Sequence, residues 1–275
     1  MEARTKSVEQ EMEHAAELPQ ADARSLIDVE RLEIAVKEMY RAVAREETDD
    51  LHFEIGRPVA ERLGYAPEIL DRVPAPALAS FAGVGHHFDL AALKPGERVL
   101  DLGSGSGTDV FFAALQVGER GSVVGIDFTD EQLQKARRVA AEQRFDNVSF
   151  EAAWIEELPF EDESFDAVIS NGVINLSPAK HLVFKEAARV LRPGGRLAIS
   201  DIVSRSALKE STRRTIDLWA ACIAGAIPRQ TYLAEIESAG LSLRERHAND
   251  YRFVSERARG ACATYGVASV SLLAS

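Results

Sequence analysis

A glycine-rich turn constrains the fold of this chain more than any other feature. Residues 101–107 read Asp-Leu-Gly-Ser-Gly-Ser-Gly and stand between an apolar strand, Val99–Leu102, and a predicted helix, Asp109–Val117. Glycines let the backbone turn sharply and let a ligand approach without a Cβ in the way. A turn of this kind, after the first strand of a parallel sheet, is typical of α/β folds that bind a nucleotide-like cofactor.

Strands and helices alternate along the chain from Arg98 onward. The pattern predicts strands at 99–102, 122–128, 148–152, 165–170 and 196–203, and helices at 109–117, 130–143 and 180–191. Thr129 is placed to cap the second helix, and Arg192–Gly195 predicts a tight turn into the fifth strand. This alternation favours a doubly wound, mostly parallel sheet that residues 232–275 complete, with ligands at the carboxyl ends of its strands.

The preceding part of the chain predicts a helical cap. Val29, Leu32, Val36, Met39, Tyr40 and Val43 recur at spacings of three and four, and prolines break the chain after them. We therefore expect a mobile N-terminal segment at 1–25, a helical cap with a lead-in loop at 26–92, and the main domain at 93–275.

Composition narrows the partners. A formal net charge of -12, without a dense basic cluster, disfavours nucleic acid. No apolar run approaches the roughly 20 residues that span a bilayer, and the N-terminus lacks the pattern of a secretory signal. With only two cysteines, Cys222 and Cys262, we expect a cytoplasmic protein that acts on a small molecule and binds no metal.

Two acidic residues indicate the kind of cofactor. Asp101 precedes the first glycine of the turn by two residues and can balance a positively charged ligand, whereas Thr108 stands where a dinucleotide fingerprint has its third glycine. Asp127, at the end of the second strand, can accept both ribose hydroxyls of an adenosine. Trp154 and Ile155 can flank the adenine. A nicotinamide oxidoreductase stays open as an alternative that the missing glycine disfavours.

Taken together, Val99–Gly107, Gly125–Asp127, Leu158–Phe160 and Val190–Gly195 resemble the class I S-adenosylmethionine-dependent methyltransferases. The resemblance covers about 93–203. It implies a Rossmann-like, seven-stranded sheet, S-adenosylmethionine as the cofactor, and a set of cofactor-binding residues: Asp101, Gly103, Ser104, Gly105, Gly107, Asp127, Phe128, Trp154, Ile155, Asn171 and Gly172. In this set, Asn171 and Gly172 end the fourth strand and would approach the methionine part and the transferred methyl group.

A narrower resemblance concerns the acceptor. Ile169–Ser177, Ser200–Val203 and Leu218–Ala226 are similar to segments of the bacterial arsenite methyltransferases, which hold arsenic through cysteine thiolates. That group has cysteines at the positions of Gly172 and Val84, and only Cys222 is kept here. One thiolate is too few for such a site, so the resemblance implies the scaffold, and we expect an acceptor other than arsenite.

No catalytic base is identified, because methyl transfer needs one only if the nucleophile arrives protonated. The candidates for the acceptor pocket are Tyr40, His52, His86, Trp219 and Cys222, and Phe53, Phe81 and Phe88 predict an apolar wall. Two further functions stay open. One is arsenite methylation with fewer thiols, and the other is a non-catalytic module that binds S-adenosylmethionine and pairs with another protein.

Overall fold

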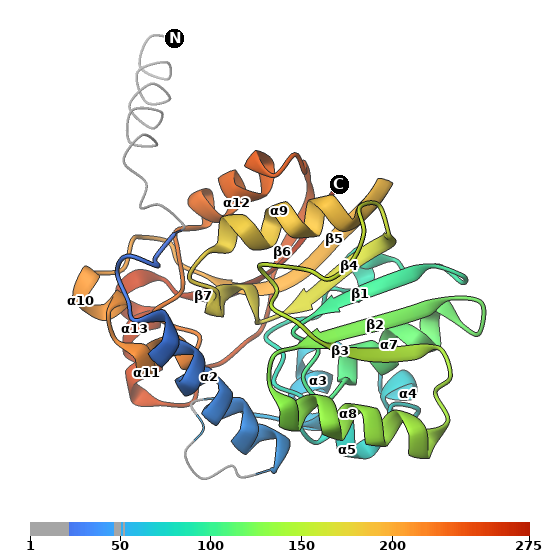
Figure 1. Cartoon of the computed structure of the whole chain (residues 1–275). Coiled ribbons are helices and arrows are strands. Elements are labelled where there is room, and N and C mark those ends of the chain that lie inside the picture. Colours follow the sequence, from blue (N-terminus) through green and yellow to red (C-terminus); the bar gives the residue numbers. More distant parts are fainter. Residues whose placement is uncertain (1–21, 47–50, 52) are drawn as a thin grey trace.

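The computed structural model describes residues 22–46, 51 and 53–275, and its strands form one seven-stranded sheet (Figure 1). The strands are β1 (Arg98–Leu102), β2 (Ser122–Asp127), β3 (Val148–Ala152), β4 (Phe165–Asn171), β5 (Leu191–Val203), β6 (Leu243–Ala248) and β7 (Ala268–Ala274). Their order in the sheet is β3-β2-β1-β4-β5-β7-β6, and only β7 runs antiparallel to its neighbours. The predicted doubly wound α/β fold is confirmed.

Helices cover both faces of the sheet (Figure 1). They are α2 (Val29–Ala44), α3 (Arg57–Leu63), α4 (Pro67–Leu70), α5 (Ala75–Leu78), α6 (Phe88–Ala91), α7 (Thr108–Val117), α8 (Asp130–Gln143), α9 (Lys180–Val190), α10 (Glu210–Arg213), α11 (Ile216–Ala220), α12 (Arg229–Ser238) and α13 (Glu256–Tyr265). The α7 and α8 helices lie on one face, and α9 and α12 lie on the other. None of the described helices is both long and apolar enough to cross a membrane.

Each face of the sheet has its own apolar core. On one side Phe111 and Phe112 of α7 pack with Val99 and with residues of α3–α6. On the other side Phe184 of α9 stacks edge-to-face on Tyr232 of α12, with ring centroids 5.1 Å apart. Because α3–α6 cover the outer side of α7, that helix is apolar nearly all round rather than along one stripe.

Of two local predictions, one is wrong. Thr129 is the N-cap residue of α8 as predicted, although its side chain makes no capping hydrogen bond; its amide donates to the Asp127 carboxylate at 2.8 Å. Arg192–Gly195 does not separate a helix from a strand, because β5 already begins at Leu191. The turn instead forms an irregularity within the strand, between the pairs Phe165–Leu191 and Ala167–Arg196.

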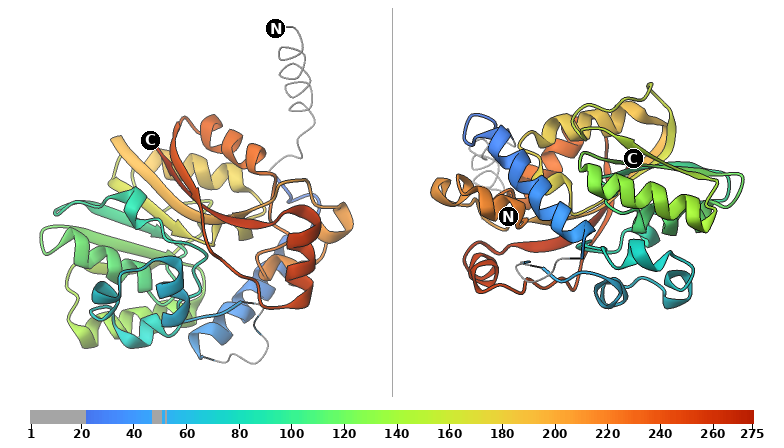
Figure 2. Two further views of the ribbon diagram at one scale, coloured as in Figure 1. Left: turned by 180° about the vertical axis from the view of Figure 1, so that it is seen from behind. Right: turned by 60° about the horizontal axis from the view of Figure 1, so that its bottom comes forward.

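The predicted N-terminal helix is present as α2, which lies across the carboxyl ends of the strands (Figure 2). It is fastened to α8 by an ion pair of 2.6 Å between Arg41 and Glu131 and by Lys135, whose ammonium group donates to the Ala44 carbonyl at 3.0 Å. The division of the chain at 92/93 stays a prediction. Most of the predicted segment 1–25 lies outside the described residues, which begin at Asp22.

Candidate functional site

A cavity of about 380 Å³ opens at the carboxyl ends of β1, β2 and β4, beneath α2. The open α/β topology places ligand sites at this edge of the sheet. Its walls come from the glycine-rich turn, the end of β2, the segment after β3, the end of β4 with the 3-10 helix η1 (Ile174–Leu176), and one side of α2. The predicted cofactor motif and the predicted helical cap therefore enclose one space.

The glycine-rich turn is tied to the end of the neighbouring strand. The Gly105 amide donates to the Asp127 carboxylate at 3.0 Å, and the Ser104 amide donates to the Ile126 carbonyl at 2.8 Å. Gly103 has a φ of +69°, and a Cβ there would lie 2.3 Å from a methyl group of Val173. This close approach requires glycine and brings the start of the turn against the loop after β4.

An aromatic pair forms the wall beyond Asp127. The rings of Phe128 and Trp154 lie 4.9 Å apart at an angle of 33°, and the Lys37 ammonium of α2 stands 5.1 Å and 5.3 Å from their centroids. The indole of Trp154 is 40% exposed although it lines the cavity, so it is not a core residue. Ile155 lines the same end. Exposed aromatic faces of this kind suit a flat heterocycle.

Three carboxylates surround the turn: Asp101 and Asp109 are buried, and Asp127 is partly buried. Burial raises the pKa of Asp101, Asp109 and Asp127, and it raises that of Asp109 to about 6. The neighbouring Asp109 and Asp127 raise the pKa of Asp101 further. Backbone amides of Thr129 and Gly105 oppose the shift at Asp127. Three acids at one cavity favour a ligand that carries positive charge.

Asn171, at the end of β4, fixes the loop that precedes β1. Its Oδ1 accepts the amides of Val84 at 2.7 Å and Gly85 at 3.2 Å. Its Nδ2 donates to the Gly85 carbonyl and to the Asp109 carboxylate, both at 3.0 Å, and lies 3.0 Å from the Tyr65 hydroxyl. Because partners within the protein already occupy the amide, Asn171 positions its neighbours.

A single side chain links the glycine-rich turn to α2. Gln132 of α8 accepts the Ser106 hydroxyl through Oε1 and donates to the Tyr40 carbonyl at 2.8 Å through Nε2. Ser106 belongs to the turn, and Tyr40 belongs to the last turns of α2. The position of α2 over the cavity is therefore coupled to the conformation of the turn.

The part of the cavity between α2 and η1 is apolar. Leu32 and Val36 of α2 face this space together with Leu176 of η1, with Val173 and with Phe81. Phe53 and Phe88, which we predicted to belong to the same wall, do not line the cavity. Phe88 instead packs against Phe112 at 4.5 Å in the core beside α7.

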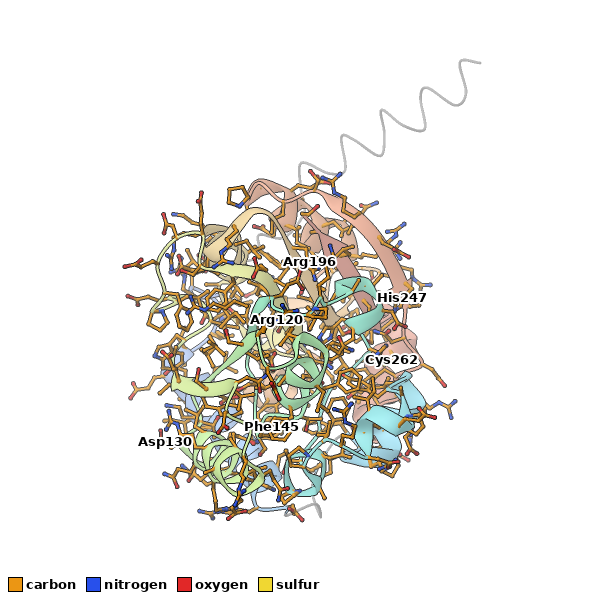
Figure 3. The ribbon with its side chains drawn as sticks, turned by 90° about the vertical axis from the view of Figure 1, so that its right-hand side faces the viewer. Arg120, Asp130, Phe145, Arg196, His247 and Cys262 are labelled. Atoms are coloured by element: carbon orange, nitrogen blue, oxygen red, sulfur yellow. The ribbon has the colours of Figure 1, made fainter. Side chains whose placement is uncertain are left out.

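The three positions at which the resemblance places thiolates lie together. A Cβ on Gly172 would be 3.1 Å from Val84 Cγ1, and the Cys222 sulfur lies 3.8 Å from the Gly172 carbonyl oxygen. Burial raises the pKa of the Cys222 thiol to about 12, so the sulfur is protonated at neutral pH. Cys262 lies half-buried on α13 and is labelled in Figure 3. Within the described residues, no three His, Cys, Asp or Glu side chains are arranged to hold a metal ion.

Most of the predicted cofactor-binding residues line the cavity. They are Asp101, Gly103, Ser104, Gly105, Asp127, Phe128, Trp154, Ile155 and Asn171. Gly107 and Gly172 do not line it. Gly107 precedes α7, where a Cβ would lie 2.8 Å from the Phe150 ring, and the Gly172 amide donates to the Ser200 carbonyl at 2.8 Å. Both glycines serve the backbone around the site.

Of the four predicted acceptor-pocket residues that the structure describes, only Tyr40 lines the cavity. Its hydroxyl lies 3.9 Å from the Cys222 sulfur, which places Cys222 directly behind it. Trp219 is 1% exposed and belongs to the core beneath α2. Its indole nitrogen is satisfied there by the Arg213 carbonyl, to which it donates a hydrogen bond. His86 packs edge-to-face on Tyr65 at 4.6 Å, away from the cavity. His52 lies outside the described residues.

Sequence reasoning missed two groups of the site. Asp109 lines the cavity from the first turn of α7, and Tyr65 donates its hydroxyl to that carboxylate at 2.7 Å. The position of Asp109, directly after a glycine-rich turn, was a signal that could have been used. The partnership with Tyr65 joins residues 44 positions apart, so no local pattern announces it.

The comparison with known proteins agrees with this geometry. Residues 93–251 match the protein family described as "Methyltransferase domain". The arsenite methyltransferase of Halobacterium salinarum is 44% identical over 181 residues, which are 66% of this chain and 46% of that protein. The arsenite methyltransferase of Aquipseudomonas alcaligenes is 42% identical over 58% of this chain and 47% of its own length. The chain thus spans about half the length of the curated relatives it matches.

Solved structures give the same picture. The crystal structure of an arsenic(III) S-adenosylmethionine methyltransferase from Chlamydomonas reinhardtii is similar with a TM-score of 0.58 and 32% identity, over 80% of this chain and 73% of that chain. A geranyl diphosphate methyltransferase in complex with geranyl diphosphate and sinefungin has a TM-score of 0.63 over 89% of this chain and 98% of its own. At 20% identity, the latter likeness concerns the fold.

Proposed function

This chain belongs to the methyltransferase-domain family, and we propose that it transfers a methyl group from S-adenosylmethionine to a small, largely apolar acceptor other than arsenite. The observation that carries this proposal is the shared cavity. One end is bounded by the cofactor motif with its buried acids, and the other by the apolar side chains of α2 and η1. In this proposal residues 93–275 form the methyltransferase domain, and 26–92 supply the cap.

The residues around the turn suit S-adenosylmethionine in charge and shape. Asp127 is the residue we assign to the ribose hydroxyls, because it is partly buried at the end of β2 and lines the cavity. Phe128, Trp154 and Ile155 offer the adenine an aromatic and apolar wall. Asp101 offers negative charge to the methionine part, whose ammonium and sulfonium are positive.

The chain's own side chains mainly orient the reactants and exclude water. When bound, S-adenosylmethionine would supply an activated methyl group and would leave as a neutral thioether, and an acceptor that arrives protonated would release its proton to water or a base. Leu32, Val36 and Leu176 would keep the acceptor in a dry space beside the turn. Asn171 would act as a positioning residue, since its amide holds the Val84–Gly85 backbone and the Asp109 carboxylate.

Arsenite is a poor match to the acceptor end. Val84 and Gly172 offer no sulfur, and the remaining thiol, Cys222, has a pKa of about 12 and lies behind Tyr40. A soft metalloid is held by two or three thiolates, which this group of residues does not provide. The arsenite methyltransferases among the relatives nevertheless keep arsenite methylation as the second candidate.

A methyl-transfer assay tests the proposal. The full chain is incubated with methyl-labelled S-adenosylmethionine and, in separate reactions, with apolar phenols, thiols and amines. We expect label in at least one organic product, with one S-adenosylhomocysteine formed for each methyl group transferred. Binding of S-adenosylmethionine without turnover on any acceptor would contradict the proposal and favour the non-catalytic binding module.

The described surface speaks for an enzyme rather than for such a module. A module that pairs with another protein needs a broad exposed apolar face. The exposed large apolar residues within the described part of the chain are Ile34, Trp154 and Val254, which come from three separate segments. We propose no nucleic-acid partner, and the cytoplasmic location predicted from the sequence stays a prediction.

A further inference from the structure

A lysine ammonium group is buried behind the apolar part of the cavity. Lys180 is 1% exposed and is the first residue of α9. Lysine is almost never fully buried without a charged partner, and the start of a helix carries the positive end of its dipole, so this place is doubly unfavourable for a cation. Among the described residues, the lysine that forms an ion pair is Lys135, 2.9 Å from Glu46, whereas Lys180 forms none. A buried charge is weak evidence for stabilisation of the fold, so Lys180 has to be explained by what its ammonium group binds.

The ammonium group binds the backbone of the segment that begins with η1. It donates to the Asn175 carbonyl at 3.0 Å and to the Ser177 carbonyl at 2.8 Å. The nitrogen also stands over the Trp219 ring, 5.1 Å from its centroid. Leu176 lies between the two bound carbonyls, and both Leu176 and Ser177 line the cavity. Lys180 thus fixes, from behind, the segment that forms the wall of the acceptor end.

The same segment is held at two further points. The Asn175 amide faces the carboxylate of Asp201 on β5 and lowers its pKa, and the Tyr232 hydroxyl donates to that carboxylate at 2.7 Å. A Cβ on Gly225 would lie 2.0 Å from the Asn175 carbonyl oxygen, so the segment after α11 packs directly on the carbonyl that Lys180 binds. The backbone of η1 is therefore held between a buried ammonium group, a buried carboxylate and a glycine.

We propose that Lys180 is a positioning residue for the acceptor: its protonated ammonium group holds η1 in the shape that lines the cavity, and loss of the proton loosens that wall. A neutral amine donates to a carbonyl more weakly than an ammonium group does. This inference rests on the proposed function and concerns its acceptor end, because the hydrogen bonds of the Lys180 side chain go to the segment 175–177.

The ammonium group loses its proton in a pH range that an experiment can reach. Burial lowers the pKa of Lys180 to about 8, against the carboxylates of Asp201 on β5 and Glu156 after β3 and the Cys222 thiol after α11, which raise it. The Arg213 guanidinium on α10 acts in the same direction as burial. Because the protonated form holds η1, the acceptor end should be intact below about pH 8 and should weaken as the pH rises through that value.

Two uncharged ligands test the two ends of the cavity separately. 5′-Methylthioadenosine is the probe for the adenosine end, and indole, titrated with that end already filled, is the probe for the acceptor end. Neither ligand titrates between pH 7 and pH 9.5, so a change in affinity belongs to the protein. By calorimetry on the full chain, we expect the indole affinity to fall about fivefold from pH 7 to pH 9.5, and that for 5′-methylthioadenosine to stay within about twofold.

Lys180→Met removes the charge and the donors but keeps a side chain of similar length. Lys185→Met, at an exposed position of the same helix, is the matched control. In Lys180→Met the indole affinity should already be about fivefold lower at pH 7 and should not change with pH, whereas Lys185→Met should behave as the wild-type chain does. A wild-type indole affinity in Lys180→Met, a fall with pH that persists in it, or an equal loss for both ligands would overturn the inference.

Hydrogen exchange in the ligand-free chain separates this inference from the proposed function. The Leu176 and Ser177 amides close η1 with hydrogen bonds of 2.9 and 3.1 Å, so a looser turn exposes them. At pH 7, mass spectrometry of the 173–179 peptide should show exchange about tenfold faster in Lys180→Met than in the wild-type chain and in Lys185→Met. Equal exchange in all three would contradict the inference.

The outcomes stay distinct. If the wild-type chain bound neither ligand, the proposed function would be wrong, and hydrogen exchange would still decide the role of Lys180. Should Lys180→Met fail to fold, the comparison of pH 7 with pH 9.5 on the wild-type chain decides, because it needs no substitution. An indole affinity that is the same at both pH values would then overturn the inference.

Discussion

The Asp127 carboxylate accepts the Gly105 amide at 3.0 Å, so the acid that ends β2 holds the glycine-rich turn in place. Its second oxygen accepts the Thr129 amide at 2.8 Å. Both carboxylate oxygens already accept backbone N–H groups. An asparagine in place of Asp127 would therefore set its side-chain NH₂ group against one of these N–H groups. The geometry of the turn and the chemistry of the ribose site thus depend on one side chain.

Asp127→Asn should therefore weaken cofactor binding. We expect the affinity for S-adenosylhomocysteine, measured by calorimetry, to fall about tenfold or more, since a charged acceptor and one turn contact are lost together. Asp130→Asn is the control: Asp130 is exposed at the start of α8 and lies at the periphery of the molecule in Figure 3. Wild-type affinity in Asp127→Asn would show that this acid does not hold the ribose.

Gly103 and Val173 provide a test of packing at the turn. Gly103→Ala places a Cβ 2.3 Å from a Val173 methyl group and forces alanine to a φ of +69°. We expect a loss of about 1–2 kcal/mol in the free energy of unfolding from the backbone alone, and more from the overlap. In denaturant unfolding, the double variant Gly103→Ala, Val173→Ala should regain the free energy lost to the steric overlap, but not the free energy lost to the backbone conformation. Strictly additive effects of the two substitutions would contradict the close approach.

We expect Val36 to affect binding of the acceptor but not binding of the cofactor. It is 2% exposed and faces the apolar part of the cavity. Val36→Phe should lower kcat/KM for an organic acceptor about tenfold by filling that space, with S-adenosylhomocysteine affinity unchanged. Ile34→Ala, on the exposed side of the same helix at 51% exposure, is the control and should leave both quantities unchanged. A loss of cofactor affinity in Val36→Phe would show that the acceptor does not bind beside Val36 but in another part of the cavity.

Cofactor binding should depend on pH in a defined direction. Asp109, faced by Tyr65, Asn171 and the Asp101 carboxylate, has a pKa raised to about 6 by burial, and a cationic ligand binds its charged form. Affinity for S-adenosylhomocysteine should rise with pH through about 6, and calorimetry in two buffers at pH 6 should reveal proton release. Proton uptake or a flat profile would refute this coupling.

The effect of Asp109 on the stability of the ligand-free chain runs in the opposite direction to its effect on binding. Its raised pKa stabilises the fold below about pH 4, and this stabilisation is lost as the pH rises through 6.

Local patterns were enough to predict the sheet and the turn. Asp101, Gly103 and Asp127 were found because strand ends and glycine spacing are written in adjacent residues. Contacts between distant segments escaped prediction: Tyr65 meets Asp109 across 44 positions, and Asn171 meets Val84 across 87. His86 and Trp219 were assigned to the acceptor pocket on residue type, and the fold uses them for packing.

The role of α2 also escaped prediction. Its apolar spacing predicted a helix, but the same spacing fits a helix packed on a core and a helix over a ligand. The side chain of Gln132, which joins α2 to the turn through Tyr40 and Ser106, lies on another helix. The way α2 packs on α8 and the turn decides which of its residues face the cavity. The spacing of apolar residues in the sequence does not reveal this packing.

The central claim concerns an acceptor that is not held by thiolates, and methylation of arsenite is the most direct test. The full chain and Cys222→Ser are incubated with S-adenosylmethionine, a thiol reductant and arsenite, and methylated arsenic is measured by mass spectrometry beside an organic acceptor. We predict no methylated arsenic above the enzyme-free blank from either protein, with the organic product formed by both. Methylated arsenic from the wild-type chain, lost in Cys222→Ser, would contradict the account and establish arsenite as the acceptor.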